Sequence, residues 1–194
     1  MQSAEQLLRD IVFTARVRGR EMTFHSTWGL FSPKRIDDGS RMLAEKVQVR
    51  EDHRTLDLGC GYGAIGVPLA MASPAGRVHM VDKDYVAVAY ARKNVQANGL
   101  TNCQVYLSNA FSEVPADVLL DNVVANLPAK VGKELLTIIL CDARRYLRPG
   151  GRLWVVTITG LRKFIQRNFL EVFGNYDKVK QGQHYTAAVA TKER

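Results

Sequence analysis

The chain has 194 residues, of which 46% are hydrophobic, and it carries a formal net charge of +8 at pH 7. This length suits one globular domain. No apolar run is long enough for a transmembrane helix, and the charged N-terminus is not typical of a secretory signal. Cys60, Cys103 and Cys141 lack the spacing of a disulfide framework or a zinc site, so we expect reduced thiols in a cytoplasmic protein.

Positive charge is concentrated in the last third of the chain. Residues 130–194 hold thirteen Lys and Arg against five Asp and Glu, whereas residues 51–129 hold five against eight. A basic segment of this kind indicates a polyanionic partner such as RNA, and a solvated basic surface is the alternative. The four histidines have no ligand-like spacing, so no metal site is predicted.

The N-terminal part of the chain has weaker patterns than the rest. Apolar residues at helical spacing over residues 4–18 predict an amphipathic helix. Loose alternation over residues 21–32 predicts a short hairpin, with Gly29 near its turn or at a bulge. Ser40 is a candidate N-cap for a helix over residues 40–49.

From residue 55 onward, predicted strands and helices alternate. Strands are predicted at residues 55–59, 77–82, 103–108, 121–126 and 152–158, and helices at 64–73, 85–99, 132–147 and 160–174. Residues 176–182 and 185–192 indicate a final antiparallel pair. This order predicts an α/β fold with a doubly wound, mostly parallel seven-stranded sheet and an antiparallel C-terminal strand. We expect residues 1–40 to form a short helix and hairpin extension, and residues 41–194 to form the main domain.

A glycine-rich turn, "DLGCGYG", follows the first strand of the alternating part. Gly59, Gly61 and Gly63 allow positive φ and the close approach of a ligand to the backbone. Asp82 ends the next strand, where a carboxylate can bind both hydroxyls of a ribose; a helix cap or turn is the alternative role. Asp57, at the strand end, would repel a pyrophosphate but would suit a cationic amino-acid group. S-adenosylmethionine is a nucleoside ligand with such a group.

The segment "LDLGCGYGAIGVPLA" resembles motif I of the Rossmann-type S-adenosylmethionine-dependent methyltransferases. More narrowly, the chain resembles the "methyltransferase small" family, which includes the small-subunit ribosomal RNA guanine-N2 methyltransferases and single-domain relatives. The other segments that carry the resemblance, from about residue 23 onward, are "TFHSTWGLFSPKRIDDGSRMLAEKV", "VDKDYVAVAYARKNVQANGL", "SNAFSEV", "NLPAKVGKE" and "LRPGGRLWVV". The resemblance implies a Rossmann-like methyltransferase domain with S-adenosylmethionine as its cofactor.

The resemblance also implies which residues bind the cofactor. The glycine turn and Asp57 would hold the methionine end, Asp82 the ribose, and Lys83 and the segment "SNAF" the adenine. The full set of implied cofactor residues is Asp57, Gly59, Cys60, Gly61, Gly63, Asp82, Lys83, Asn109, Ala110 and Asn126. Many relatives have Asp where this chain has Asn109, whose amide oxygen can still contact the adenine amino group. Residues 36–40, "IDDGS", are expected to cover the cofactor.

The segment "NLPAK" occupies the position of the Asn/Asp-Pro-Pro-aromatic motif of amino-group methyltransferases. The resemblance implies that Asn126 and Pro128 are catalytic. In this motif the Asn side-chain oxygen and the next carbonyl accept hydrogen bonds from both N–H groups of an exocyclic amine, which aims the lone pair of its nitrogen at the methyl group. The chain departs from the motif at Leu127 and Ala129, where the family has Pro and an aromatic residue or Ile. An aromatic residue there would stack on an extruded base. Leu127, Ala129 and Lys130 are expected to contact the substrate.

The first functional hypothesis is an S-adenosylmethionine-dependent N-methyltransferase that acts on the exocyclic amine of guanine in ribosomal RNA. Trp28, Phe31 and Tyr62 are candidates to replace the missing aromatic residue. A single copy of the fold would bind RNA through its own N-terminal segment or as a homodimer, unless its substrate is smaller. The alternatives are a methyltransferase of a small molecule or protein, for which Ala129 leaves room, and a catalytically silent module that binds cofactor or RNA.

Overall fold

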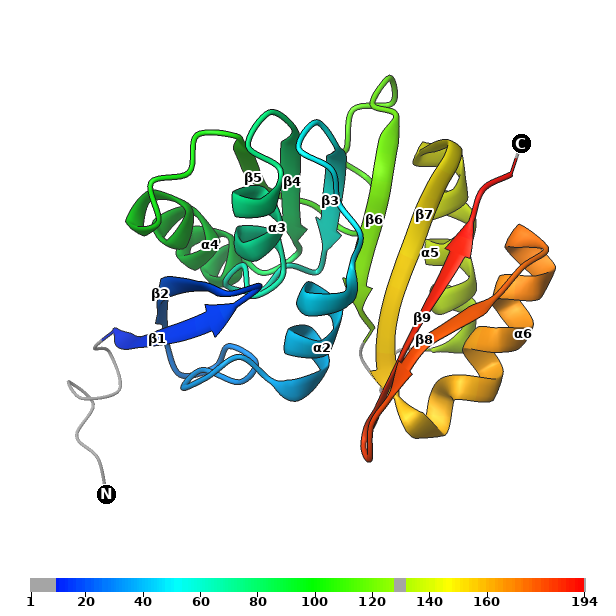
Figure 1. Cartoon of the computed structure of the whole chain (residues 1–194), viewed down its shortest axis with the longest axis horizontal. Helices are drawn as coiled ribbons and strands as arrows, with labels where there is room; N and C mark the ends of the chain where they lie inside the picture. The colour runs from blue at the N-terminus through cyan, green and yellow to red at the C-terminus, as the bar shows by residue number, and fades with distance from the viewer. Residues whose placement is uncertain (1–9, 128–131, 194) are drawn as a thin grey trace.

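A seven-stranded sheet lies between two layers of helices (Figure 1). The computed structural model describes residues 10–127 and 132–193. Within these residues the strand order is β5-β4-β3-β6-β7-β9-β8. The strands are β3 (Arg54–Leu58), β4 (Arg77–Asp82), β5 (Cys103–Leu107), β6 (Leu120–Asn126), β7 (Leu147–Ile158), β8 (Asp177–Gln181) and β9 (Tyr185–Thr191). The five strands from β5 to β7 are parallel, and β9 pairs antiparallel with both β7 and β8, which confirms the predicted fold class.

The helices bury one apolar stripe each against the two faces of the sheet. The helices are α2 (Asp38–Lys46), α3 (Gly66–Ala72), α4 (Tyr85–Ala97), α5 (Lys133–Tyr146) and α6 (Arg162–Phe173), with a 3-10 turn, η1, at Thr159–Leu161. One core lies under α2, α3 and α4, and the other under α5 and α6 (Figure 1). Because both faces are covered, β6 reads "LDNVVAN" and is buried along all but its last residue. None of the described helices is long and apolar enough to cross a membrane.

The predicted N-terminal helix is wrong wherever the structure describes it. Residues 11–17 form β1 (Ile11–Val17), which pairs antiparallel with β2 (Arg20–Ser26) in a separate two-stranded sheet. The turn between the two strands lies at Arg18 and Gly19, both at positive φ, whereas Gly29, predicted near a turn or bulge, lies in a separate turn after β2 at a φ of 98°. Inward and outward residues alternate along β1, with Ala15 buried. The same apolar residues also fit helical spacing, so tertiary packing against the hairpin's other strand decided the outcome.

The predicted N-cap of α2 is also wrong. Asp37, and not Ser40, caps the helix, because its Oδ1 accepts hydrogen bonds from the backbone N–H groups of Gly39 (3.0 Å) and Ser40 (3.1 Å). The hydroxyl of Ser40 does not cap the helix, and it forms a hydrogen bond with a residue of the candidate site instead.

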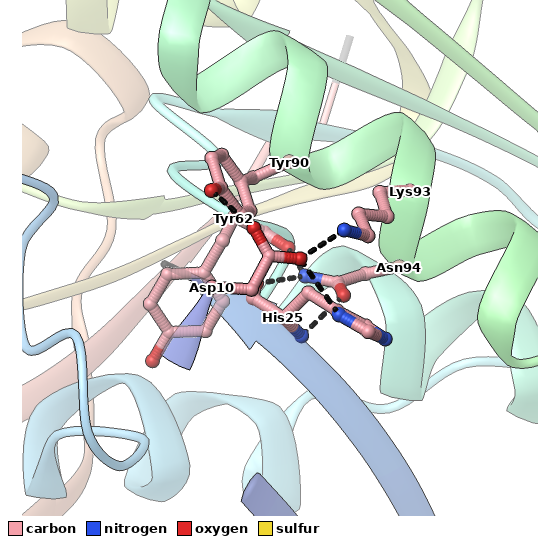
Figure 2. A network of polar contacts seen from close by, with 6 residues as sticks. All are labelled: Asp10, His25, Tyr62, Tyr90, Lys93 and Asn94. Atoms are coloured by element: carbon pink, nitrogen blue, oxygen red, sulfur yellow. Dashed lines mark hydrogen bonds and ion pairs between the residues drawn. The ribbon is translucent and has the colours of Figure 1, made fainter. Parts of the chain in front are cut away.

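Asn94 of α4 and Asn98, the C-cap that follows this helix, bind the outer edge of β2. Asn94 accepts a hydrogen bond from the backbone N–H of His25 (2.6 Å) and donates to the same residue's carbonyl (2.8 Å). Asn98, one helical turn later, makes the equivalent pair with Thr23 (3.1 and 2.8 Å). The second amide hydrogen of Asn94 binds the carbonyl of Tyr62 at 2.8 Å, which ties the hairpin and α4 to the glycine turn (Figure 2).

Asp10 adds an ionic contact between the hairpin and α4. Its carboxylate accepts a hydrogen bond from the hydroxyl of Tyr90 (2.7 Å), forms an ion pair with Lys93 and lies 3.2 Å from Nδ1 of His25 (Figure 2). The hydrogen bonds from Lys93 and Tyr90 lower the pKa of Asp10 to about 2. The hairpin is therefore fastened to α4 both through its backbone edge and through this carboxylate.

Candidate active site

A cavity of about 530 Å³ opens at the carboxyl ends of β3, β4 and β6, where a doubly wound sheet binds its ligands. Its wall combines the turn after β3, the ends of β4 and β6, the loop before α2 and one side of α5. Lining residues that the sequence predicted are Gly59, Cys60, Gly61, Asp82, Lys83, Asn109, Ala110, Asn126 and Leu127. The volume lies within the range of small-molecule and cofactor sites.

The glycine turn presents bare backbone to the cavity. Gly59 and Gly61 have φ of 71° and 57°, and a Cβ at either position would meet no protein atom within 4 Å. Such a Cβ would occupy space that a ligand can use. The N–H groups of Gly59 and Cys60 both bind the carbonyl of Val81 at 2.9 Å, so β4 fixes the shape of the turn. The turn is a preformed cradle for a ligand that lies flat against the backbone.

Asp57 lies behind the glycine turn and is not among the residues that line the cavity. One carboxylate oxygen accepts the N–H of Gly66 at 2.7 Å, and the other has no hydrogen-bond partner among the described residues. Burial raises the pKa of Asp57 to about 7; the Gly66 N–H opposes this shift, and the charge of Asp82 adds to it. A buried carboxylate with an unpaired oxygen favours a cationic group nearby, which the ammonium of a methionine would supply.

Gly66 was not singled out in the sequence, yet it is essential to this arrangement. A Cβ at Gly66 would lie 2.8 Å from the Met80 side chain and 2.9 Å from the Asp57 carboxylate. The sequence places this glycine close to the site, because "AIG" follows the glycine turn directly. Gly63, at a φ of 91°, packs against Val67 below the turn and is not on the cavity wall.

The carboxylate of Asp82 is held at the cavity wall by two backbone N–H groups. Oδ2 accepts from Gly61 at 2.9 Å, and Oδ1 accepts from Asp84 at 3.0 Å. Asp84 is the residue that caps α4, through the N–H of Val86 at 2.8 Å. The helix-capping alternative for Asp82 therefore belongs to Asp84, two residues later, whereas the bond from the Asp84 N–H also gives Asp82 the alternative role in a turn; Asp82 lines the cavity with Lys83.

The segment "SNAF" forms the far side of the same end of the cavity. Ala110 has a φ of 51°, and the hydroxyl of Ser108 donates to its carbonyl at 2.7 Å. The backbone N–H of Asn109 donates to Ser112 Oγ at 3.2 Å, while its side chain is exposed. This tight turn brings Asn109 and Ala110 to the wall of the cavity that also holds Asp82 and Lys83.

Asn126 stands at the end of β6 with its amide nitrogen already engaged. Nδ2 donates to Ser40 Oγ at 3.0 Å and lies 3.4 Å from Asp37 Oδ1, both at the start of α2. No described residue donates a hydrogen bond to the amide oxygen, which belongs to a half-buried side chain on the cavity wall. Leu127 is buried and its N–H binds the Val156 carbonyl at 3.0 Å. Pro128, Ala129 and Lys130 lie outside the described residues.

The donor set of the cavity is that of an organic ligand and not of a metal. Within the described ranges no group of three or more His, Cys, Asp or Glu side chains is placed to hold a metal ion. The thiol of Cys60 is buried in the turn, and burial raises its pKa, so the thiol stays protonated. The bare glycine turn and the fixed carboxylate of Asp82 line the cavity, and the buried carboxylate of Asp57 lies behind the turn; this arrangement fits S-adenosylmethionine.

Comparison with known proteins gives the same class. The chain is 36% identical over 142 residues to YbxB, an uncharacterized protein of Bacillus subtilis. This match covers 73% of this chain and 71% of YbxB. It is 32% identical to ribosomal RNA large subunit methyltransferase G of Streptomyces avermitilis, over 90% of this chain and 46% of that one. The structure of the T. thermophilus 16S rRNA guanine-N2 methyltransferase RsmC, in complex with AdoMet and guanosine, matches with a TM-score of 0.85 and 31% identity. That match covers 93% of this chain and 50% of that one.

The fold and the site define a Rossmann-like methyltransferase that uses S-adenosylmethionine. The family model described as the methyltransferase small domain matches residues 21–188, so the chain belongs to that family. The predictions of family, enzyme class and cofactor are confirmed. The chain spans about half the length of the curated ribosomal RNA methyltransferases that it matches.

Proposed function

We propose that the protein methylates the exocyclic N2 amine of a guanine in ribosomal RNA. The observation that carries the proposal is the state of Asn126. Its amide nitrogen is committed to Ser40 and Asp37, and no donor among the described residues binds its amide oxygen, on a residue that lines the same cavity as the glycine turn. An oxygen in that position suits an N–H donor on the substrate.

An exocyclic amine is a weak nucleophile because its lone pair is delocalised into the ring. When bound, S-adenosylmethionine supplies an electrophilic methyl group on a sulfonium. The Asn126 oxygen would accept a hydrogen bond from one N–H group of the amine, which favours a tetrahedral nitrogen. The bonds from Nδ2 to α2 keep this amide from rotating, so the orientation is fixed before the substrate arrives. No strong general base is required, because the proton leaves the nitrogen readily once the methyl group is attached.

The comparisons support RNA as the substrate. RsmC is a 16S rRNA guanine-N2 methyltransferase, and several curated relatives act on the large ribosomal subunit RNA. The net charge of +8 agrees with a polyanionic partner. The chain spans about half the length of each of those relatives.

The test is a transfer assay with methyl-labelled S-adenosylmethionine. The protein is incubated separately with deproteinised ribosomal RNA, assembled ribosomal subunits, free nucleosides, a protein extract and small metabolites. RNA is then digested to nucleosides and analysed by mass spectrometry, with Asn126→Ala as the inactive control. We expect N2-methylguanosine from RNA or subunits. Label found only in metabolites or protein would reject the proposal in favour of the alternative methyltransferase.

RNA binding gives an independent measurement. Counterion release predicts that the logarithm of the association constant falls with the logarithm of salt concentration, by about 0.7 to 0.9 for each phosphate contacted. A slope close to zero would contradict an RNA substrate even if the protein binds its cofactor.

A further inference from the structure

The ring of Phe31 is held in water at the cavity wall. Its relative exposure is 66%, and it lines the same cavity as the glycine turn and Asn126. Leu30, immediately before it, is 8% exposed, and Ile36, which follows in the same loop, is 2% exposed. Leu30 and Ile36 stabilise the fold by burying their side chains, whereas the exposed ring of Phe31 does not make this contribution. Because this exposed ring lies on the ligand cavity, a molecule bound there can cover it.

The loop that carries Phe31 is rigid. Ser32 adopts a φ of 49°, and its hydroxyl donates to the Arg35 carbonyl at 2.6 Å. From below, the hydroxyl of Tyr62 lies 3.1 Å from the Arg35 carbonyl and 3.3 Å from that of Ser32. Burial raises the pKa of Tyr62, so this hydroxyl keeps its proton and remains a donor. The ring of Phe31 is thus presented on a backbone that is fixed before any ligand binds.

The other two candidates for a stacking residue are excluded by their contacts. Tyr62 is 3% exposed, and its ring packs edge-on against Phe13 and Phe24, with centroids 6.0 and 5.9 Å away. Trp28 does not line the cavity, and the ammonium of Lys34 lies 4.8 Å from its ring centroid. Among the described residues that line the cavity, Phe31 is the aromatic residue with an open face.

We propose that Phe31 is the platform on which the substrate base stacks, in the role that an aromatic residue at position 129 would otherwise have; this inference rests on the proposed function. Position 129 is Ala, whose methyl group offers no face for stacking. Phe31 lies on the loop that leads to Asp37 and Ser40, and these two residues contact the Asn126 amide. The proposed platform and the amine-binding oxygen therefore line the same cavity.

The cofactor is the other candidate to cover Phe31, and its chemistry argues against this. Its flat part is the adenine, which the resemblance assigns to the end of the cavity formed by Asp82, Lys83 and Asn109. The methionine end is zwitterionic and has no π face. A planar partner for Phe31 is therefore the substrate base. Stacking tolerates any base, so Phe31 supplies affinity and orientation, whereas recognition of the amine stays with Asn126.

The experiment uses a fluorescent nucleoside that carries the same exocyclic amine. The full-length protein is saturated with S-adenosylhomocysteine and titrated with 2-aminopurine riboside, whose emission is quenched when it stacks. Variants are Phe31→Ala, Phe31→Leu and Phe31→Trp, and Trp28→Ala is the matched control on the same loop. We expect quenching with the wild-type protein, the control and Phe31→Trp, and loss of quenching with a rise in the dissociation constant of about 5- to 100-fold for Phe31→Leu and Phe31→Ala. Calorimetry should give an unchanged affinity for S-adenosylmethionine in every variant.

The outcomes separate the inference from the function beneath it. If Phe31→Leu binds and quenches the nucleoside as the wild-type protein does, the base does not stack on Phe31 and the inference is wrong while the function stands. If the Phe31 variants bind the cofactor more weakly but bind the nucleoside as the wild-type protein does, the ring packs on the cofactor and the inference is again overturned. If the wild-type protein binds cofactor but does not quench the nucleoside, the inference is overturned, whereas the proposed function is decided separately by methyl transfer to ribosomal RNA.

Discussion

Replacing Asn126 by Ala removes the amide oxygen that we assign to the substrate amine. The rate constant kcat/KM should fall by at least about 10²-fold, equivalent to about 2.7 kcal/mol, as for the loss of one aligned hydrogen-bond acceptor or donor in a transition state. The variant also loses the bond from Nδ2 to Ser40 at 3.0 Å and the longer contact with Asp37 at 3.4 Å. Each is a bond at a half-buried side chain, so unfolding should become easier by only about 1 to 2 kcal/mol.

The measurement is methyl transfer to ribosomal RNA under kcat/KM conditions, with calorimetry of S-adenosylmethionine binding on the same sample. Affinity for the cofactor should change by less than tenfold, or about 1.4 kcal/mol, because the glycine turn and Asp82 supply the other contacts. Ser40→Ala keeps the oxygen but frees the amide to rotate, so we expect a smaller loss of about 5- to 10-fold. An Asn126→Ala protein that is folded and retains activity within about threefold of wild type would refute the role given to this oxygen.

Three further predictions concern the support of the site. Gly66→Ala places a Cβ 2.8 Å from Met80 and 2.9 Å from the Asp57 carboxylate, so chemical denaturation should find the variant less stable by about 1 to 3 kcal/mol. The pKa of Asp57 is raised from 3.8 to about 7, so its contribution to the free energy of unfolding falls as pH rises through that window; Asp57→Asn should remove this decline in urea titrations at several pH values. The pKa of Asp10 is lowered to about 2, chiefly by Lys93, so Asp10→Asn should be less stable than wild type above pH 3.8 and the two proteins should converge as pH falls towards 2.

The sequence predicts the central part of the fold well, because its signals there are local. The strand at residues 77–82 has the predicted bounds, and the helix over residues 85–97 ends two residues before the predicted limit at Gly99. Both elements are bounded by residues whose local chemistry is unambiguous, such as Asp84 at the helix start. The glycine turn was likewise recognisable, since glycine adopts positive φ without strain and Gly59, Gly61 and Gly63 all do so.

What the sequence could not predict depends on partners far along the chain. Asn126 and Ser40 are separated by 86 residues, and nothing in either segment indicates that their side chains meet. Asp57 was predicted to hold the methionine end of the ligand, and nothing in its own segment indicates that its carboxylate accepts the N–H of Gly66, nine residues later. The N-terminal strand has apolar residues that suit two periods, and only its pairing with residues 20–26 chooses between them.

The way α4 borders the hairpin has a consequence for solubility. Asn94 and Asn98 are four residues apart, a rise of about 6 Å along a helix, which is close to the two-residue repeat of about 6.8 Å along a strand. Each amide offers one donor and one acceptor to residues 23 and 25 of β2, much as an adjoining strand would. The backbone N–H and C=O groups of residues 23 and 25 are therefore already hydrogen-bonded within the chain. They are not available to pair with a strand of another molecule, which protects this edge of the two-stranded sheet from aggregation.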